Sequence, residues 1–256
     1  MSKIVFFDID GTLLDHNKVL PASAKEAIAE LKKKGIFVAI ATGRAPFMFK
    51  PLREELDLDS YVSFNGQYVV FENEAIYKNP LDETELVRIS GESAKNGHPL
   101  IYMNEHTMKA TAASHSSIET CMGSLKFPHP EKDENFFKAR DIYQTLIFCK
   151  TGEEDAYVRE YPGFHFIRWH PLSSDILPSG GSKAEGIKKM AGRLGFRLED
   201  VYAFGDGLND IEMLQSVGTG VAMGNALDEV KSHADLVTAD VAEDGIWNGL
   251  KKLGLI

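Results

Sequence analysis

Cysteine is nearly absent from the sequence: Cys121 and Cys149 are the only two among 256 residues. They form no Cys-x-x-Cys pair and no Cys/His cluster, so the sequence indicates neither a disulfide framework nor a structural zinc site. Such sparse cysteine fits a reducing compartment, and we expect a cytoplasmic location.

The sequence also has no excess of positive charge, because 28 Lys and Arg residues face 38 Asp and Glu residues and give a formal net charge of -10 at pH 7. The basic residues are scattered and form no stripe of the kind that nucleic-acid binding needs. We therefore expect no nucleic-acid partner. A small phosphorylated substrate is not excluded, because a local cation, a lysine and backbone N–H groups can hold phosphate whatever the net charge.

Long hydrophobic runs are missing as well. No apolar segment approaches the length of a membrane-spanning helix, so we expect no membrane partner. Hydrophobic residues nevertheless make up 43% of the chain and charged residues 26%, which is the balance of a globular protein with a sizeable core. The length suits one core domain that carries a smaller insertion.

Short apolar runs alternate with helical patterns near both ends of the sequence. A run that is apolar at every position, such as residues 4–7, is typical of a parallel strand buried on both faces. The predicted strands here cover residues 4–7, 36–41, 61–64, 201–204 and 220–223. The predicted helices cover residues 21–34, 46–56, 182–194, 208–216, 226–232 and 246–253. This alternation predicts an α/β fold with a parallel, Rossmann-like sheet.

The middle of the sequence, from about residue 82 to residue 178, has a different rhythm. Its short strands and helices are mixed, which predicts an antiparallel sheet with helices rather than further parallel units. We therefore expect a core domain formed by residues 1–81 and 183–256, with an α+β domain inserted at residues 82–182.

Asp8 and Asp10 lie two residues apart at the end of the first predicted strand, before Gly11 and Thr12. Two carboxylates held so close repel each other unless a cation joins them, and hard oxygen ligands suit magnesium. Asp8 could then attack phosphorus while Asp10 protonates the leaving group. An Asp pair before a glycine can equally form a turn or cap a helix, so the pair alone leaves both interpretations open.

A second group of polar residues follows the predicted strand at residues 201–204. It contains Asp206, Asn209 and Asp210. Ligands collect at the carboxyl ends of parallel strands, so we expect Asp206 to complete a metal site with Asp8. Asn209 and Asp210 could hold metal-bound waters or orient a neighbouring lysine. The alternative is that they only cap the following helix.

Two further segments supply groups that can hold a phosphate. Thr42, Gly43 and Arg44 end the second long strand, where a hydroxyl and free N–H groups make a phosphate nest. Lys183 begins a predicted helix and offers a positive charge to the transferring phosphoryl oxygens. We expect Thr42 to anchor phosphate and Arg44 to reach a distal part of the substrate, although each lysine or arginine could also be an ordinary surface residue.

Together these features resemble the haloacid-dehalogenase-like (HAD) hydrolase superfamily. Residues 8–13 match its first motif, Thr42 its second, Lys183 its third and residues 205–210 its fourth. The Ala-Thr-Gly-Arg run at residues 41–44, the Asn65-Gly66 pair and the insertion between the second and third motifs resemble the Cof-type phosphatases, which carry a large α/β cap.

The resemblance implies Asp8 as nucleophile, Asp10 as general acid and base, and Thr42 and Lys183 as phosphate holders. It also implies Mg2+ bound by the Asp8 side chain, the Asp10 backbone carbonyl and Asp206. The remaining candidates for binding phosphate or substrate are Gly11, Gly43, Arg44, Asn65 and Asn209.

The function predicted on this basis is a magnesium-dependent phosphatase that acts on a sugar phosphate, nucleotide or cofactor phosphate through an aspartyl phosphate. Two alternatives stay open on the sequence alone. A phosphomutase would use the same nucleophile, Asp8, and a binding module could keep the fold without catalysis. The sequence predicts neither the oligomeric state nor the individual substrate.

Overall fold

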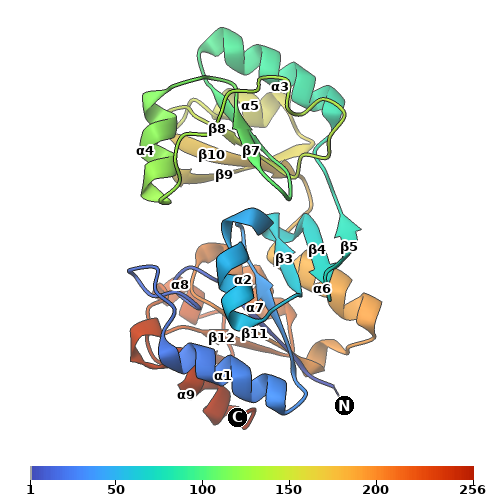
Figure 1. Cartoon of the computed structure of the whole chain (residues 1–256), viewed down its shortest axis with the longest axis vertical. Coiled ribbons are helices and arrows are strands. Elements are labelled where there is room, and N and C mark those ends of the chain that lie inside the picture. Colours follow the sequence, from blue (N-terminus) through green and yellow to red (C-terminus); the bar gives the residue numbers. More distant parts are fainter. Residues whose placement is uncertain (1) are drawn as a thin grey trace. The chain divides into compact units, whose positions relative to one another are not determined.

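The computed structural model describes residues 2–256, and the chain divides into two compact units (Figure 1). We call them the core unit and the inserted unit. The core unit comprises the residues up to Arg44, Met48–Lys78 and Ser182–Ile256, and the inserted unit comprises Ala45–Phe47 and Asn79–Gly181. Among residues 2–256, no helix has both the length and the apolar character needed to cross a membrane.

The core unit is built on an eight-stranded sheet in the order β13-β12-β11-β1-β2-β3-β4-β5. Its strands are β1 (Ile4–Phe7), β2 (Phe37–Ala41), β3 (Tyr61–Ser63), β4 (Tyr68–Phe71), β5 (Glu74–Lys78), β11 (Val201–Gly205), β12 (Thr219–Ala222) and β13 (Leu236–Val237). The pairs from β13 through to β3 are parallel, and β4 and β5 add antiparallel strands at one edge. The predicted parallel α/β core is confirmed.

Helices cover this sheet because apolar side chains alternate between its two faces. Ile4 and Phe6 of β1 pack in a cluster with Ile187 and Met190 of α6, so Val5 and Phe7 point to the other face. The helices of the core unit are α1 (Ala22–Lys33), α2 (Lys50–Leu56), α6 (Lys183–Leu194), α7 (Ile211–Ser216), α8 (Asp228–Lys231) and α9 (Gly245–Lys252). Helix α1 packs against α9, and α6 packs against α7, β3 and β4.

Glycine allows α6 to approach the sheet closely. A Cβ atom added at Gly186 would lie 2.4 Å from Val62 Cγ1 and 2.9 Å from Gly66 Cα, whereas one added at Gly192 on the same helix would meet nothing within 4 Å. We expect Gly186→Ala to lower the free energy of unfolding by about 1–3 kcal/mol through overpacking. The matched Gly192→Ala should leave it unchanged or raise it by up to about 1 kcal/mol, because alanine favours helix. Urea unfolding measures both, and equal changes would contradict this packing.

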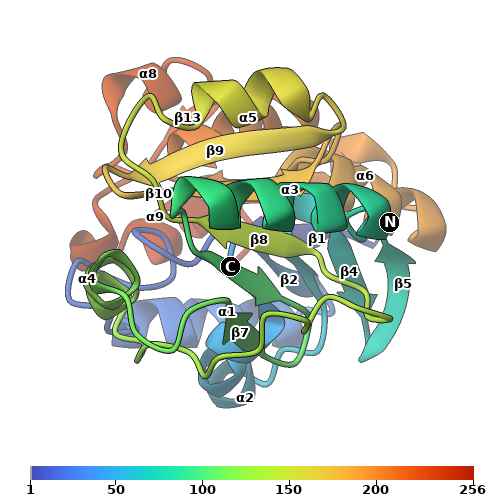
Figure 2. The ribbon, with the colours of Figure 1, turned by 90° about the horizontal axis from the view of Figure 1, so that it is seen from above.

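The inserted unit has a five-stranded antiparallel sheet in the order β7-β6-β8-β10-β9. Its strands are β6 (Leu100–Met103), β7 (Met108–Ala110), β8 (Gln144–Ile147), β9 (Phe164–His170) and β10 (Ser173–Pro178), and its helices are α3 (Glu83–Asn96), α4 (Ser116–Ser124) and α5 (Asp155–Glu160). Figure 2 shows α3 and α5 running alongside this sheet. Helix α3 begins where the Asp82 side chain accepts a hydrogen bond from Glu85 N and ends at Gly97 in the left-handed conformation. This is the α+β insertion that the sequence predicted.

Some predicted elements differ from the structure. The helix predicted over residues 46–56 is a 3-10 turn at Pro46–Met48 followed by α2, whose Pro51 suits only the first turn of a helix. The helix predicted from residue 208 likewise starts as a 3-10 turn, Leu208–Asp210, before α7. Strand β13 was not predicted, because two residues carry no measurable alternation.

Candidate active site

The predicted site residues of the core unit follow neighbouring strands of one sheet. Asp8 comes directly after β1, Thr42 after β2 and Asp206 after β11. Because β1 pairs in parallel with both β2 and β11, the carboxyl ends of these strands meet at the same edge. Asp8 N donates to Phe204 O at 3.0 Å, which fixes the start of the loop after β1 against β11.

Three carboxylates form a compact acidic cluster at this edge. Asp8, Asp206 and Asp210 each offer an oxygen within 4.8 Å of the others, and Asp8 and Asp210 are buried. Burial raises the pKa of the Asp8 carboxyl from 3.8 to about 7, although the neighbouring Lys183 ammonium opposes the rise. Burial and the negative charge of Asp210 raise the pKa of Asp206 to about 6. A divalent cation fits this oxygen donor set, because it would offset both the cost of burying these carboxylates and their mutual repulsion.

Lys183 lies between two of these carboxylates. Its side chain is 1% exposed, and Nζ donates to Asp8 Oδ1 at 2.5 Å and to Asp210 Oδ1 at 2.7 Å. Burial alone would lower the pKa of Lys183, but the carboxylates of Asp210 and Asp8 outweigh burial and raise it. The ammonium is therefore charged and fixed beside the Asp8 carboxylate. From the sequence, Asp210 could cap the helix, hold a metal-bound water or orient a lysine; in the structure its Oδ1 accepts from Lys183 and its Oδ2 accepts from Asp206 N and Gly207 N.

The Asp10 side chain is hydrogen-bonded to two cations and is not one of the three carboxylates of the acidic cluster. Arg44 Nε donates to Asp10 Oδ2 at 2.8 Å, Arg44 Nη2 donates to Oδ1 at 2.6 Å, and Lys18 Nζ donates to Oδ1 at 2.6 Å. Burial alone would raise the pKa of Asp10, but the hydrogen bonds and charges of Arg44 and Lys18 outweigh it and lower the pKa. Arg44 was expected to reach a distal part of the substrate; in the structure it pairs with Asp10.

The phosphate-binding candidates after β2 and β3 lie close together. Thr42 is buried, and its Oγ1 accepts from Arg44 N at 3.1 Å while its carbonyl accepts from Asn65 N at 3.1 Å. Asn65 has a left-handed φ of 50°, and Asn209 Nδ2 donates to its Oδ1 at 3.4 Å. A Cβ added at Gly43 would lie 3.0 Å from Asn65 Nδ2. Thr42, Gly43, Asn65 and Asn209 thus form one polar cluster from three loops.

Gly11 and Asp206 are in close approach. A Cβ added at Gly11 would lie 2.1 Å from Asp206 Oδ2, and its φ of 83° also favours glycine. Asn225 Nδ2 donates to Gly11 O at 2.8 Å and approaches Asp206 Oδ2 at 3.4 Å. Asn225 was not among the site residues predicted from the sequence, although it lies shortly after the predicted strand at residues 220–223, as Asp8 and Asp206 lie after theirs.

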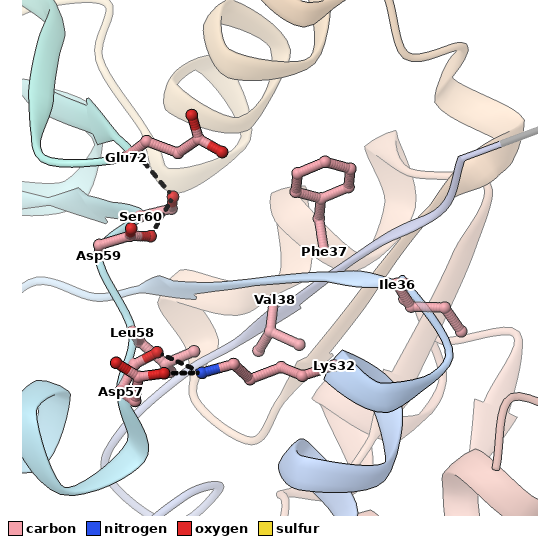
Figure 3. Close-up of a pocket in the computed structure, with 10 residues that line it drawn as sticks. Lys32, Ile36, Phe37, Val38, Asp57, Leu58, Asp59, Ser60 and Glu72 are labelled. Atoms are coloured by element: carbon pink, nitrogen blue, oxygen red, sulfur yellow. Dashed lines mark hydrogen bonds and ion pairs between the residues drawn. The ribbon is translucent and has the colours of Figure 1, made fainter.

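A separate pocket of about 250 Å³ in the core unit offers a contrast (Figure 3). Its only lysine, Lys32, donates to Asp57 O at 2.6 Å and pairs with the Asp57 carboxylate. Ser60 Oγ donates to Asp59 and accepts from Glu72 N (Figure 3). These polar groups are hydrogen-bonded to one another, and the carboxylates of Asp57, Asp59 and Glu72 in the lining repel anions. The strand ends are therefore the better candidate for a phosphate site.

Comparison with known proteins identifies the family of this chain. A family model described as haloacid dehalogenase-like hydrolase matches residues 5–250. The chain therefore belongs to the haloacid dehalogenase-like hydrolases and, within them, to the Cof-type phosphatases, as its motifs predicted. It is accordingly an enzyme that acts on phosphate esters.

Individual relatives cover the whole chain. "Putative phosphatase YkrA" of Bacillus subtilis (strain 168) is 53% identical over 255 residues, which are 100% of this chain and 99% of the relative. The crystal structure of a hypothetical protein from Geobacillus kaustophilus HTA426 is 58% identical with a TM-score of 0.97, and all of both chains is covered. The HAD subclass IIB sugar phosphatase BT4131 is 32% identical with a TM-score of 0.86, again over all of both chains.

Proposed function

We propose that this protein is a magnesium-dependent phosphatase that hydrolyses a small phosphorylated metabolite through an aspartyl phosphate on Asp8. The observation that carries the proposal is the buried contact of Lys183 with Asp8 and Asp210, beside Asp206. A buried lysine next to three carboxylates is costly to fold, and it is suited to a site where a phosphoryl group and a cation arrive together.

The proposed reaction has two displacements. In the first, an Asp8 oxygen forms a bond to phosphorus as the bond to the leaving oxygen breaks, and Asp10 gives that oxygen a proton. In the second, Asp10 takes a proton from water, the water oxygen bonds to phosphorus, and the bond to Asp8 breaks to release inorganic phosphate. The proton taken from water restores the acid for the next turnover.

Each remaining group has a proposed role in this scheme. Mg2+, held by Asp206, the Asp8 side chain and the Asp10 backbone carbonyl, would neutralise charge on the phosphoryl oxygens. Lys183 and Thr42 hold those oxygens, with Gly11, Gly43, Asn65 and Asn209 around them. Arg44 and Lys18 keep Asp10 ionised in the free protein, whereas a bound phosphate dianion favours its protonated form because like charges repel.

We propose a sugar phosphate, nucleotide or cofactor phosphate as the substrate class, which the likeness to a sugar phosphatase supports. The inserted unit is proposed as the cap domain that selects among these substrates. A cytoplasmic location is proposed from the two cysteines, both of which are free thiols in the structure.

Removal of divalent metal is expected to abolish phosphate release. Wild-type protein is assayed with a panel of sugar phosphates, nucleotides and cofactor phosphates, with Mg2+ and with excess chelator. We expect release only with Mg2+, and restoration when Mg2+ is added back, since the acidic cluster needs a cation to admit an anionic phosphate. Equal release in chelator would contradict the metal requirement, and no release from any ester would contradict the phosphatase.

A further inference from the structure

Lys18 is a cation that none of the four sequence motifs includes, yet it contacts the proposed acid and base. It lies in the loop between β1 and α1, and its Nζ donates to Asp10 Oδ1 at 2.6 Å. Arg44, which follows β2, grips the same carboxylate through Nε and Nη2. The Asp10 carboxylate is therefore held by two cations from two different loops of the core unit.

The loop is built in a way that aims Lys18 at Asp10. Asp15 Oδ1 accepts from the backbone N–H groups of Asn17 and Val19, both at 2.8 Å, and Asp15 O accepts from Lys18 N at 2.9 Å. Lys18 itself has a φ of 63°, in the left-handed region that a lysine rarely adopts. Such a backbone persists only where its surroundings determine it, and it recurs at functional sites.

Stability does not account for this contact. The side chains of Lys18 and Asp10 are 41% and 37% exposed, and ion pairs with that much exposure contribute little to folding. The geometry instead fixes a direction. Arg44 alone leaves the carboxylate free to swing together with the guanidinium, whereas a second donor at Oδ1 stops that motion. Oδ1 then carries two hydrogen bonds and Oδ2 one, which leaves Oδ2 more open for proton exchange.

We propose that Lys18 is a positioning residue for Asp10: with Arg44, it holds the carboxylate so that Oδ2 faces the leaving-group oxygen. The inference rests on the proposed function, because it concerns the proton that Asp10 gives in the first displacement. In that step the proton passes from Asp10 Oδ2 to the leaving oxygen as its bond to phosphorus breaks and the Asp8–phosphorus bond forms.

Leaving groups of different basicity test this role. A sugar alkoxide leaves only with a proton, whereas nitrophenolate is stable as an anion and leaves without one. The rate of leaving-group release in a single turnover isolates the first displacement, in which Asp10 acts as the acid. For Lys18→Met we expect this rate to fall about tenfold on a sugar phosphate, within the range of general acid catalysis. For p-nitrophenyl phosphate we expect it within about twofold of wild type, and an unchanged KM for both esters. Lys18→Arg should restore most of the loss.

The control is Lys25→Met, which removes an exposed lysine whose Nζ lies 2.9 Å from Glu55 Oε1. This substitution should leave the hydrolysis rates of both esters unchanged. Equal falls for the two esters, a change in KM alone, or no recovery in Lys18→Arg would overturn the positioning role. Wild-type protein that hydrolyses neither ester would instead contradict the proposed function, and the inference with it. Melting temperatures of all variants identify a loss that comes from misfolding.

Discussion

Asp8→Asn is expected to lower the rate of phosphate release at least about 10³-fold while the protein stays folded, because a carboxamide of the same shape cannot form the phosphoryl bond. Asparagine fits the site, since Asp8 is only 6% exposed and its main polar partner, Lys183, keeps its contact with Asp210. Steady-state release of phosphate from the best ester, together with the melting temperature, measures both parts of this prediction.

The same substitution has an expected pH signature. The pKa of Asp8 is raised from 3.8 to about 7 in the folded protein, so its ionised form is disfavoured by folding. The stability that the protonated carboxyl contributes is fully present below pH 3.8 and is lost as the pH rises through 7. In excess chelator, Asp8→Asn should therefore gain in stability relative to wild type as the pH rises over this interval.

Asp57→Asn serves as the matched control for Asp8→Asn. Asp57 is an exposed residue in the left-handed conformation after α2, a backbone state that asparagine tolerates well. We expect wild-type turnover from this variant. If Asp8→Asn kept turnover within about tenfold of this control, the nucleophile would not be Asp8, because loss of a nucleophile costs far more than that.

Lys183→Met is expected to lower the free energy of unfolding by about 3–5 kcal/mol, since it leaves buried Asp8 and Asp210 without their counter-ion. Turnover should be lost with it, because the ammonium is the proposed partner of the phosphoryl oxygens. The loss of stability should be smallest in acid, where the Asp8 carboxyl, whose pKa burial raises to about 7, takes up a proton. Urea unfolding at pH 5 and pH 8 measures this difference.

A double variant separates the structural effect of Lys183 from the catalytic one. Asp210→Asn removes one of the two buried charges but keeps an oxygen for the N–H groups of Asp206 and Gly207, which Asp210 Oδ2 accepts at 3.0 and 2.9 Å. In the double variant, Asp210→Asn should recover part of the free energy of unfolding that Lys183→Met loses, but it should not restore turnover. Lys188→Met, an exposed site on α6, is the control and should change stability by less than about 1 kcal/mol. Equal stability of the Lys183→Met and Lys188→Met variants would contradict the buried ion pairs.

The positions of the main site residues were predictable because they depend on sheet topology. Apolar runs that end abruptly identified β1, β2 and β11, and parallel pairing then brings Asp8, Thr42 and Asp206 to one edge. Lys183 was predictable as the first residue of α6, where Ser182 caps the helix by accepting from Glu185 N. The roles of these residues stay predictions until the variants are measured.

Contacts made by loop residues could not be predicted from the sequence. Lys18 meets Asp10 only because its loop takes a left-handed turn, and neither periodicity nor composition predicts that. Arg44 was expected to reach a distal part of the substrate or to be an ordinary surface residue. Nothing in the sequence pairs it with Asp10, yet in the structure the two residues are hydrogen-bonded neighbours. Asn225 also follows a predicted strand, but asparagine is so common in turns that its position alone does not indicate a site residue.

The most direct test of the central claim is chemical trapping of the phosphoryl group. Wild-type protein with Mg2+ is mixed with an ester labelled at phosphorus, quenched in acid during turnover, digested and examined by mass spectrometry. We expect one labelled peptide, modified at Asp8, and no label in Asp8→Asn. Rapid turnover with no labelled peptide, or with the label on another residue, would contradict the aspartyl phosphate on Asp8.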